Sequence, residues 1–219
     1  MPNYHVYSAD ISPFAQRVVL QLEYKGVPFT QGHPPGGFQS DAYGKINPMR
    51  RMPVLRIDGD YLPESEIICE FIEQMHPEPT LLPEDPMERA RGRLISRIAD
   101  TYIMNPMMPL FKNFSRATRD ERVDDLALKT IQQGLNYLDH WIAPGTYANA
   151  GRLTLADFAA ATILRYVTQY PPIFGMKEPL SELSNVSTYV SLCREDSHIE
   201  RGLSRIEAGW ETLKSGKAN

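Results

Sequence analysis

Cysteines and long apolar runs are scarce in this chain. Its 219 residues include two cysteines, Cys69 and Cys193, which lie far apart and form no C-x-x-C pattern. A disulfide framework or a zinc site is therefore not indicated, and we predict that both side chains are structural. The apolar runs fall well short of the ~20 residues that a membrane-spanning helix needs. Because the N-terminus also lacks a basic segment followed by an apolar one, we expect a cytoplasmic protein with no membrane partner.

Positive charge is not in excess either. The net charge is −4 at pH 7, and the sequence contains no basic block or arginine stripe. This balance argues against a nucleic-acid partner. The five histidines form no H-x-x-x-H pair, so we expect no metal site. With 42% hydrophobic residues, the chain can form one or two compact domains with a sizeable core.

Two short motifs in the first third of the chain are suited to holding a small peptide. The first is Arg51-Met52-Pro53, which precedes a short apolar strand, and the second is Glu64-Ser65, which precedes an amphipathic helical run. Because the residue before a proline favours extended backbone, Met52 can present its N–H and C=O groups to a ligand strand. Ser65 lies near a helix N-terminus, where unpaired N–H groups and the helix dipole attract a carboxylate. The two motifs together predict an anion site beside an extended backbone edge.

A third motif, Ser12-Pro13, follows a strand predicted over Tyr4–Tyr7. Serine followed by proline is typical of the N-cap and first position of a helix, because the hydroxyl accepts from first-turn N–H groups and proline loses no hydrogen bond there. The Ser12 hydroxyl is therefore predicted to lie at the positive end of a helix. Spacing alone favours a helix cap as its only role.

The chain divides by its periodicity into an α/β part and a helical part. Residues 1–78 alternate strand and helix signals, including a helix over Pro13–Tyr24 and a hairpin turn at Asp58-Gly59. Residues 79–86 are rich in proline and are predicted to form a stiff linker. Residues 87–219 show helical periods almost without strand signals, which indicates an all-helical domain.

A capping box opens one of the later predicted helices. In Thr154-Leu155-Ala156-Asp157, the Thr154 side chain can bond the Asp157 amide while the Asp157 carboxylate bonds the Thr154 amide. We assign this motif to folding of the helical domain.

In combination, these motifs resemble the soluble glutathione transferases of the serine type, and the tau, zeta and theta classes are the most similar. The resemblance is carried by Ser-Pro-Phe-x-x-Arg-Val at 12–18, Asn-Pro-x-x-Arg-x-Pro-Val-Leu at 47–55, Glu64-Ser65 and the capping motif at 150–157. It covers essentially the whole chain. It implies a thioredoxin-like α/β N-terminal domain, an all-α helical C-terminal domain, glutathione as co-substrate and a homodimer.

The resemblance also implies roles for the site residues. Ser12 becomes the catalytic residue, which donates its O–H to the glutathione sulfur and favours the thiolate. The extended backbone at Met52-Pro53 binds the peptide part of glutathione, Glu64 accepts the amine and Ser65 takes the γ-glutamyl carboxylate.

The glycyl carboxylate of glutathione is assigned to Arg51. Its neighbour Arg50 is an alternative, and either arginine is also consistent with a solvated surface charge. Gln39 and Lys45 are further polar candidates before the Asn-Pro loop, and the residue that completes this part of the site stays open.

The electrophile pocket is expected on the helical domain. Methionines recur at helical spacing with an aromatic residue, and a flexible, polarizable stripe of this kind suits a tolerant apolar pocket. Core packing explains the stripe at least as well. The residues proposed to line the pocket are Tyr102, Met104, Met108 and Phe111.

The predicted function is conjugation of the glutathione thiolate to an apolar electrophile, with a role in detoxification. A glutathione-dependent isomerase is one alternative, although the zeta-class Ser-Ser-Cys pattern is replaced here by Ser12-Pro13-Phe14. A lyase or ether-cleaving enzyme that uses the same thiolate is another, and a non-catalytic binding module is a third. Omega and glutaredoxin-like relatives place cysteine where Ser12 stands, which argues against a mixed-disulfide mechanism.

Overall fold

The computed structural model describes residues 2–114 and 119–215. The chain divides into two compact units, of which the first comprises residues 1–81 with 200–219 and the second residues 82–199. The C-terminal segment, which we expected in the helical domain, thus packs with the first unit. Among the described residues, no helix is both long and apolar enough to cross a membrane.

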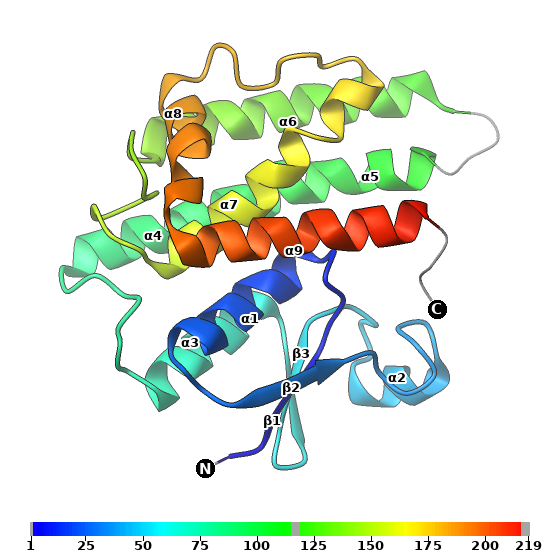
Figure 1. Cartoon of the computed structure of the whole chain (residues 1–219). Coiled ribbons are helices and arrows are strands. Elements are labelled where there is room, and N and C mark those ends of the chain that lie inside the picture. The colour runs from blue at the N-terminus through cyan, green and yellow to red at the C-terminus, as the bar shows by residue number, and fades with distance from the viewer. Residues whose placement is uncertain (1, 115–118, 216–219) are drawn as a thin grey trace. The chain divides into compact units, whose positions relative to one another are not determined.

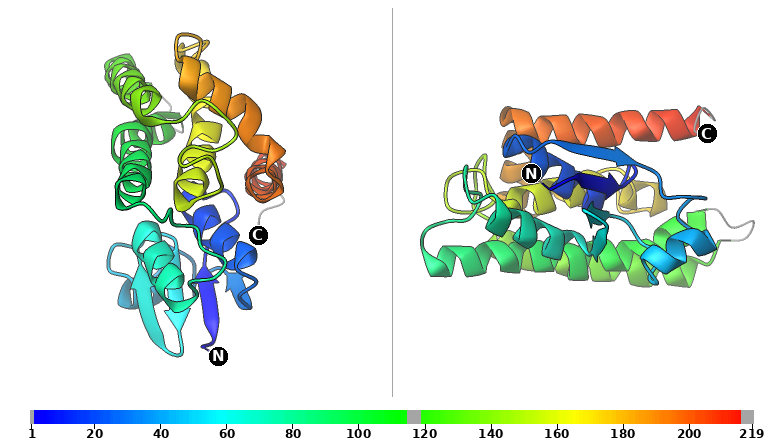
Figure 2. Two further views of the ribbon diagram at one scale, coloured as in Figure 1. Left: turned by 90° about the vertical axis from the view of Figure 1, so that its left-hand side faces the viewer. Right: turned by 90° about the horizontal axis from the view of Figure 1, so that it is seen from below.

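The first unit contains a mixed four-stranded sheet in the order β2-β1-β3-β4 (Figures 1 and 2). Its strands β1 and β2 are parallel and joined through a helix, whereas β3 and β4 form an antiparallel hairpin next to β1. This arrangement confirms the thioredoxin-like α/β expectation. The strands are β1 (Tyr4–Tyr7), β2 (Phe29–Gly32), β3 (Val54–Ile57) and β4 (Asp60–Pro63).

Helices α1 and α3 pack side by side against this sheet (Figure 1). Helix α1 (Pro13–Tyr24) has the predicted bounds, and α3 (Ser65–Met75) begins at the predicted serine. The sequence did not predict strand β2 or the short helix α2 (Asp41–Ile46). Strand β2 depends on its pairing with β1, which is distant in the sequence.

Helix α9 (Ser197–Lys214) contributes its residues from Glu200 onward to the first unit, where they run along α1 (Figure 1). Gly202 allows a close approach, because a Cβ at this position would lie 2.5 Å from Cδ1 of Leu20 in α1. Gly209 also allows a close approach, to the segment that precedes α1, where its Cβ would lie 2.8 Å from Cγ2 of Ile11. The glycines therefore let the two backbones meet closely.

The second unit is helical. Helices α4, η1 and α5 follow one another and pack against the long α6 (Figures 1 and 2). The η1 segment is a π-helix, and α5 follows it and continues through Pro106 and Pro109. The helices are α4 (Pro86–Ile98), η1 (Ala99–Met104), α5 (Asn105–Phe114), α6 (Glu121–Trp141), α7 (Leu155–Val167), η2 (Pro171–Phe174), α8 (Ser184–Leu192) and η3 (Cys193–Glu195).

The predicted capping box is present at the start of α7. The buried Asp157 carboxylate accepts from the Thr154 N–H at 2.8 Å and from the Thr154 hydroxyl at 2.9 Å. It also accepts from the Ala148 N–H at 2.6 Å, which ties the preceding loop to the helix. Burial nevertheless raises the pKa of Asp157 to about 7, since these contacts include no cation.

Candidate functional site

The register of the sheet brings the three predicted motifs to one end of the first unit. Tyr7, the last residue of β1, pairs with Val54, the first of β3, and Val54 in turn pairs with Pro63, the last of β4. The segment that leaves β1, the segment that enters β3 and the segment that leaves β4 therefore lie at the same end of the sheet. These segments carry the Ser12, Met52-Pro53 and Glu64-Ser65 motifs, which are up to 53 residues apart in the chain.

Ser12 is the N-cap of α1, with extended backbone angles and Pro13 as the first helical residue. Its Oγ accepts a hydrogen bond from the Ala15 N–H at 3.2 Å. The side chain is 8% exposed, and its own proton is donated to no residue that the structure describes. Ser12 therefore offers a hydroxyl proton at the positive end of a helix, where a negative charge is stabilised.

The segment before β3 is fixed by hydrogen bonds to a single carbonyl group. The Arg51 C=O accepts from the Tyr43 hydroxyl at 2.6 Å and from the buried Asn47 side chain at 2.9 Å. Met52 follows, with a cis peptide bond to Pro53, and lies outside the β1–β3 ladder. Its backbone N–H and C=O groups make no hydrogen bond with any described residue, so they are available to a further extended segment.

The two neighbouring arginines have different surroundings. Arg50 donates to the Gln39 carbonyl oxygen at 2.5 Å and pairs with Asp41 at 2.8 Å, so it holds the loop around α2. The Arg51 guanidinium is exposed and makes no hydrogen bond or ion pair with any residue within 2–114 or 119–215. Lys45, at the end of α2, is also exposed. Of the two arginines, Arg51 is the one that can turn to a ligand without breaking a contact.

Glu64 and Ser65 form the start of α3. Glu64 has φ 71° and ψ 112°. A residue other than glycine adopts such a backbone conformation at a cost of about 1 to 3 kcal/mol. Its side chain does not cap the helix, and Ser65 at the first helical position is buried. A helix N-terminus without a side-chain cap attracts a further acceptor, although Glu66 adds a negative charge nearby. Neither residue type signals the positive φ, and sequence reasoning missed it.

The four predicted pocket residues lie in different surroundings within the second unit. Met104 is only 4% exposed and belongs to the core, whereas Tyr102 is 45% exposed and meets Tyr137 of α6 edge to face at 5.6 Å between ring centroids. Met108 is half-buried. Phe111 meets an aromatic pair at the end of α7. Their role as an electrophile pocket stays a prediction.

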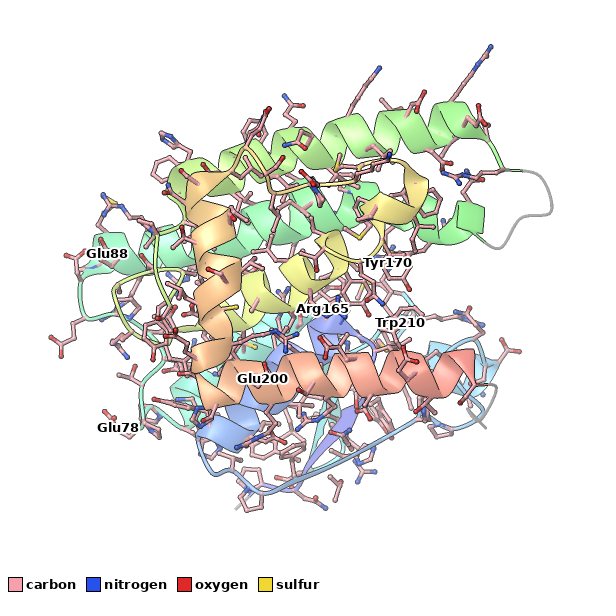
Figure 3. The ribbon with its side chains drawn as sticks, turned by 45° about the horizontal axis from the view of Figure 1, so that its top comes forward. Glu78, Glu88, Arg165, Tyr170, Glu200 and Trp210 are labelled. Carbon is pink, nitrogen blue, oxygen red and sulfur yellow. The ribbon has the colours of Figure 1, made fainter. Side chains whose placement is uncertain are left out.

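That aromatic pair was not found from the sequence. Tyr166 and Tyr170 stack with their ring centroids 5.7 Å apart, and Phe111 meets the Tyr170 ring edge to face at 4.7 Å. Figure 3 labels Tyr170, just beyond the last turn of α7. Burial raises the pKa of Tyr170 to about 12, so its hydroxyl stays protonated at neutral pH. The spacing of four residues in a helical stretch is the signal that indicates the pair.

The described part of the chain contains no cluster of three or more His, Cys, Asp or Glu side chains that could hold a metal ion.

Comparison with known proteins finds two matching family models. Residues 6–80 match the model described as glutathione S-transferase, N-terminal domain, and residues 98–195 match glutathione S-transferase, C-terminal domain. The two matches fall on the sheet-containing part and on the helical part of the chain.

Curated relatives and solved structures agree with these matches. The chain is 30% identical over 212 residues to the maleylacetoacetate isomerase of Rattus norvegicus, covering 93% of this chain and 88% of the relative. It is 28% identical over 158 residues to glutathione S-transferase U2 of Arabidopsis thaliana, covering 71% and 67%. A glutathione S-transferase from Methylobacterium radiotolerans, solved in complex with glutathione sulfonate, superposes with a TM-score of 0.76 at 25% identity over 92% of this chain and 94% of that one.

Proposed function

This chain belongs to the glutathione S-transferase family, and we propose that it activates the glutathione thiol through Ser12 and transfers the thiolate to an apolar electrophile. One observation carries the proposal. The Ser12 oxygen accepts the Ala15 N–H, while its proton has no acceptor among the described residues. The hydroxyl is thus oriented by the helix and free to donate to sulfur.

The energy that this hydroxyl can supply matches what activation requires. A free thiol has a pKa of about 8.5, so only a few per cent is thiolate at neutral pH. Lowering the pKa by two units needs about 2.7 kcal/mol of preferential interaction with the anion. A hydrogen bond to a charged group contributes about 1.5 to 3 kcal/mol, and a helix N-terminus adds about 0.3 to 1 kcal/mol. Ser12 at the start of α1 combines both contributions.

The remaining site residues bind the peptide part of glutathione. In this proposal the Met52 backbone pairs with the extended tripeptide, and the Arg51 guanidinium meets the glycyl carboxylate. Ser65 and the first-turn amides of α3 take the γ-glutamyl carboxylate, while Glu64 accepts the amine. The positive φ of Glu64 supports this assignment, because backbone strain of this kind is frequent at ligand-binding sites.

A second candidate function is glutathione-dependent isomerisation. The similarity to the maleylacetoacetate isomerase of Rattus norvegicus supports this candidate. Addition of the thiolate to a double bond, rotation and elimination would return glutathione unchanged. Conjugation instead consumes one glutathione per product. Measuring glutathione consumed against substrate converted therefore separates the two activities, starting with a generic conjugation substrate and a cis-unsaturated diacid.

The experiment that tests Ser12 is the thiolate absorbance of bound glutathione against pH. In the parent protein the thiol is expected to titrate about one to three units below the free thiol. In Ser12→Ala the pKa should return toward the free value while the glutathione Kd stays within a few-fold. Ser65→Ala is the matched control, with weaker binding and an unchanged thiol pKa. A thiol that titrates normally in the parent would favour a non-catalytic binding module.

Quaternary structure and location complete the proposal. We expect a cytoplasmic homodimer, as the family resemblance implies, and light scattering of the purified protein tests the oligomeric state.

A further inference from the structure

The segment that leads to Ser12 is held by a buried glutamine of α1. The Gln16 side chain is 1% exposed, and its Nε2 donates to the Asp10 carbonyl oxygen at 2.9 Å. The Ser12 N–H donates to the Ala9 carbonyl oxygen at 2.9 Å. These two hydrogen bonds anchor the turn formed by residues 9–12, which ends at Ser12. Because the turn feeds directly into the N-cap, its position sets where the Ser12 hydroxyl lies.

The same glutamine is oriented by helix α9. Its Oε1 accepts from the Arg205 guanidinium at 3.0 Å, and Arg205 also donates to Glu23 at 2.8 Å. Arginine has donors only, so it selects the amide orientation in which Gln16 turns its oxygen to α9 and its NH2 group to Asp10. Without Arg205, only the Asp10 carbonyl oxygen would still favour this amide orientation.

The backbone of α9 also approaches the same segment closely. A Cβ on Gly209 would lie 2.8 Å from Cγ2 of Ile11 and 3.3 Å from the Ile11 backbone nitrogen. Gly209 and Arg205 are four residues apart on α9 and so share a face of the helix. Glu200 and Trp210, labelled in Figure 3, mark the stretch of α9 that contains this face.

We propose that this face of α9 positions the catalytic serine, with Gln16 and Arg205 as positioning residues and Gly209 as the contact point on Ile11. The inference rests on the proposed role of Ser12. It makes the C-terminal helix, whose residues are far from Ser12 in the sequence, a determinant of how well the hydroxyl points at the glutathione sulfur.

Two substitutions test the hydrogen-bond relay. Gln16→Glu keeps an oxygen for Arg205 but replaces the donor to Asp10 by an acceptor, and Arg205→Met removes one of the two groups that orient the amide. In both variants the pKa of bound glutathione thiol should rise by about 0.5 unit or more, which is roughly a threefold loss of thiolate at fixed pH. The glutathione Kd, measured by calorimetry, should stay within about threefold.

Two matched variants serve as controls. Arg205→Lys keeps a group that only donates and should retain the parent thiol pKa. Arg201→Met removes a second arginine of α9, whose guanidinium lies 3.7 Å from Glu23, and should also titrate like the parent. Circular dichroism confirms that each variant is folded. If Gln16→Glu does not fold, the Arg205→Met variant still provides the test, because Arg205 is partly exposed.

The outcomes separate this inference from the proposed function. If Ser12→Ala raises the thiol pKa but folded Arg205→Met does not, the positioning role is wrong and Ser12 keeps its own. If glutathione affinity falls as much as the thiolate fraction, Arg205 and Gln16 are merely structural, which also overturns the inference. If Ser12→Ala leaves the thiol pKa unchanged, both proposals fall together.

Discussion

Replacing Gly134 by alanine is expected to destabilise the second unit by about 2 kcal/mol, although alanine is the better helix former. Gly134 lies in α6, and a Cβ at this position would be 2.1 Å from the Tyr102 carbonyl oxygen and 2.6 Å from its carbon. These are backbone atoms of η1, which cannot rotate away as a side chain can. Overpacking costs up to about 3 kcal/mol, whereas the gain in helix propensity is about 1 kcal/mol. The steric cost should therefore exceed the gain in helix propensity.

Gly92→Ala in α4 is the matched control. Its Cβ would meet Asn149 Nδ2 at 3.4 Å and the Ala156 Cβ at 3.7 Å, which are ordinary van der Waals distances. The higher helix propensity of alanine is then the main effect, and this variant should gain up to about 1 kcal/mol in the free energy of unfolding. Urea unfolding followed by circular dichroism measures both changes. Equal stability of Gly134→Ala and the parent, or the same sign for both variants, would refute the reasoning.

Three further predictions concern charged residues. Burial raises the pKa of Asp157 to about 7 from about 4 in the unfolded chain, so the native state binds the extra proton and stability should fall by about 4 kcal/mol as pH rises from about 4 to 7. Denaturant titrations of the parent against Asp157→Asn across this range should show that slope only in the parent. Arg51→Met should weaken glutathione binding about tenfold; calorimetry with γ-glutamylcysteine, which lacks the glycyl carboxylate, should show no such loss if Arg51 contacts that group. Changing Lys25, whose side chain is fully buried and lies 2.9 Å from Glu73, to Met should cost about 3 to 5 kcal/mol, because a buried carboxyl group is left without its cation. Thermal unfolding checks this value, and recovery in the double variant with Glu73→Gln supports the cause.

Features that depend on neighbouring residues could be predicted from the sequence. Helix α1 begins after Ser12 because the serine caps and the proline fits the first helical position, and both effects act within one turn. The Asp157 capping box is equally local. The chain's family followed from such motifs in order, because each one leaves a recognisable pattern of residue types.

Features that depend on contacts between distant residues were decided only by the tertiary structure. Strand pairing through Tyr7 and Val54 brings three separate motifs to one end of the sheet, and no single motif encodes that register. The ion pair between Arg50 and Asp41, which distinguishes Arg50 from its neighbour Arg51, also forms only in the folded loop around α2. The packing of α9 against the Ser12 segment likewise depends on side chains some 190 residues apart in sequence, since residues this distant meet only when the chain folds.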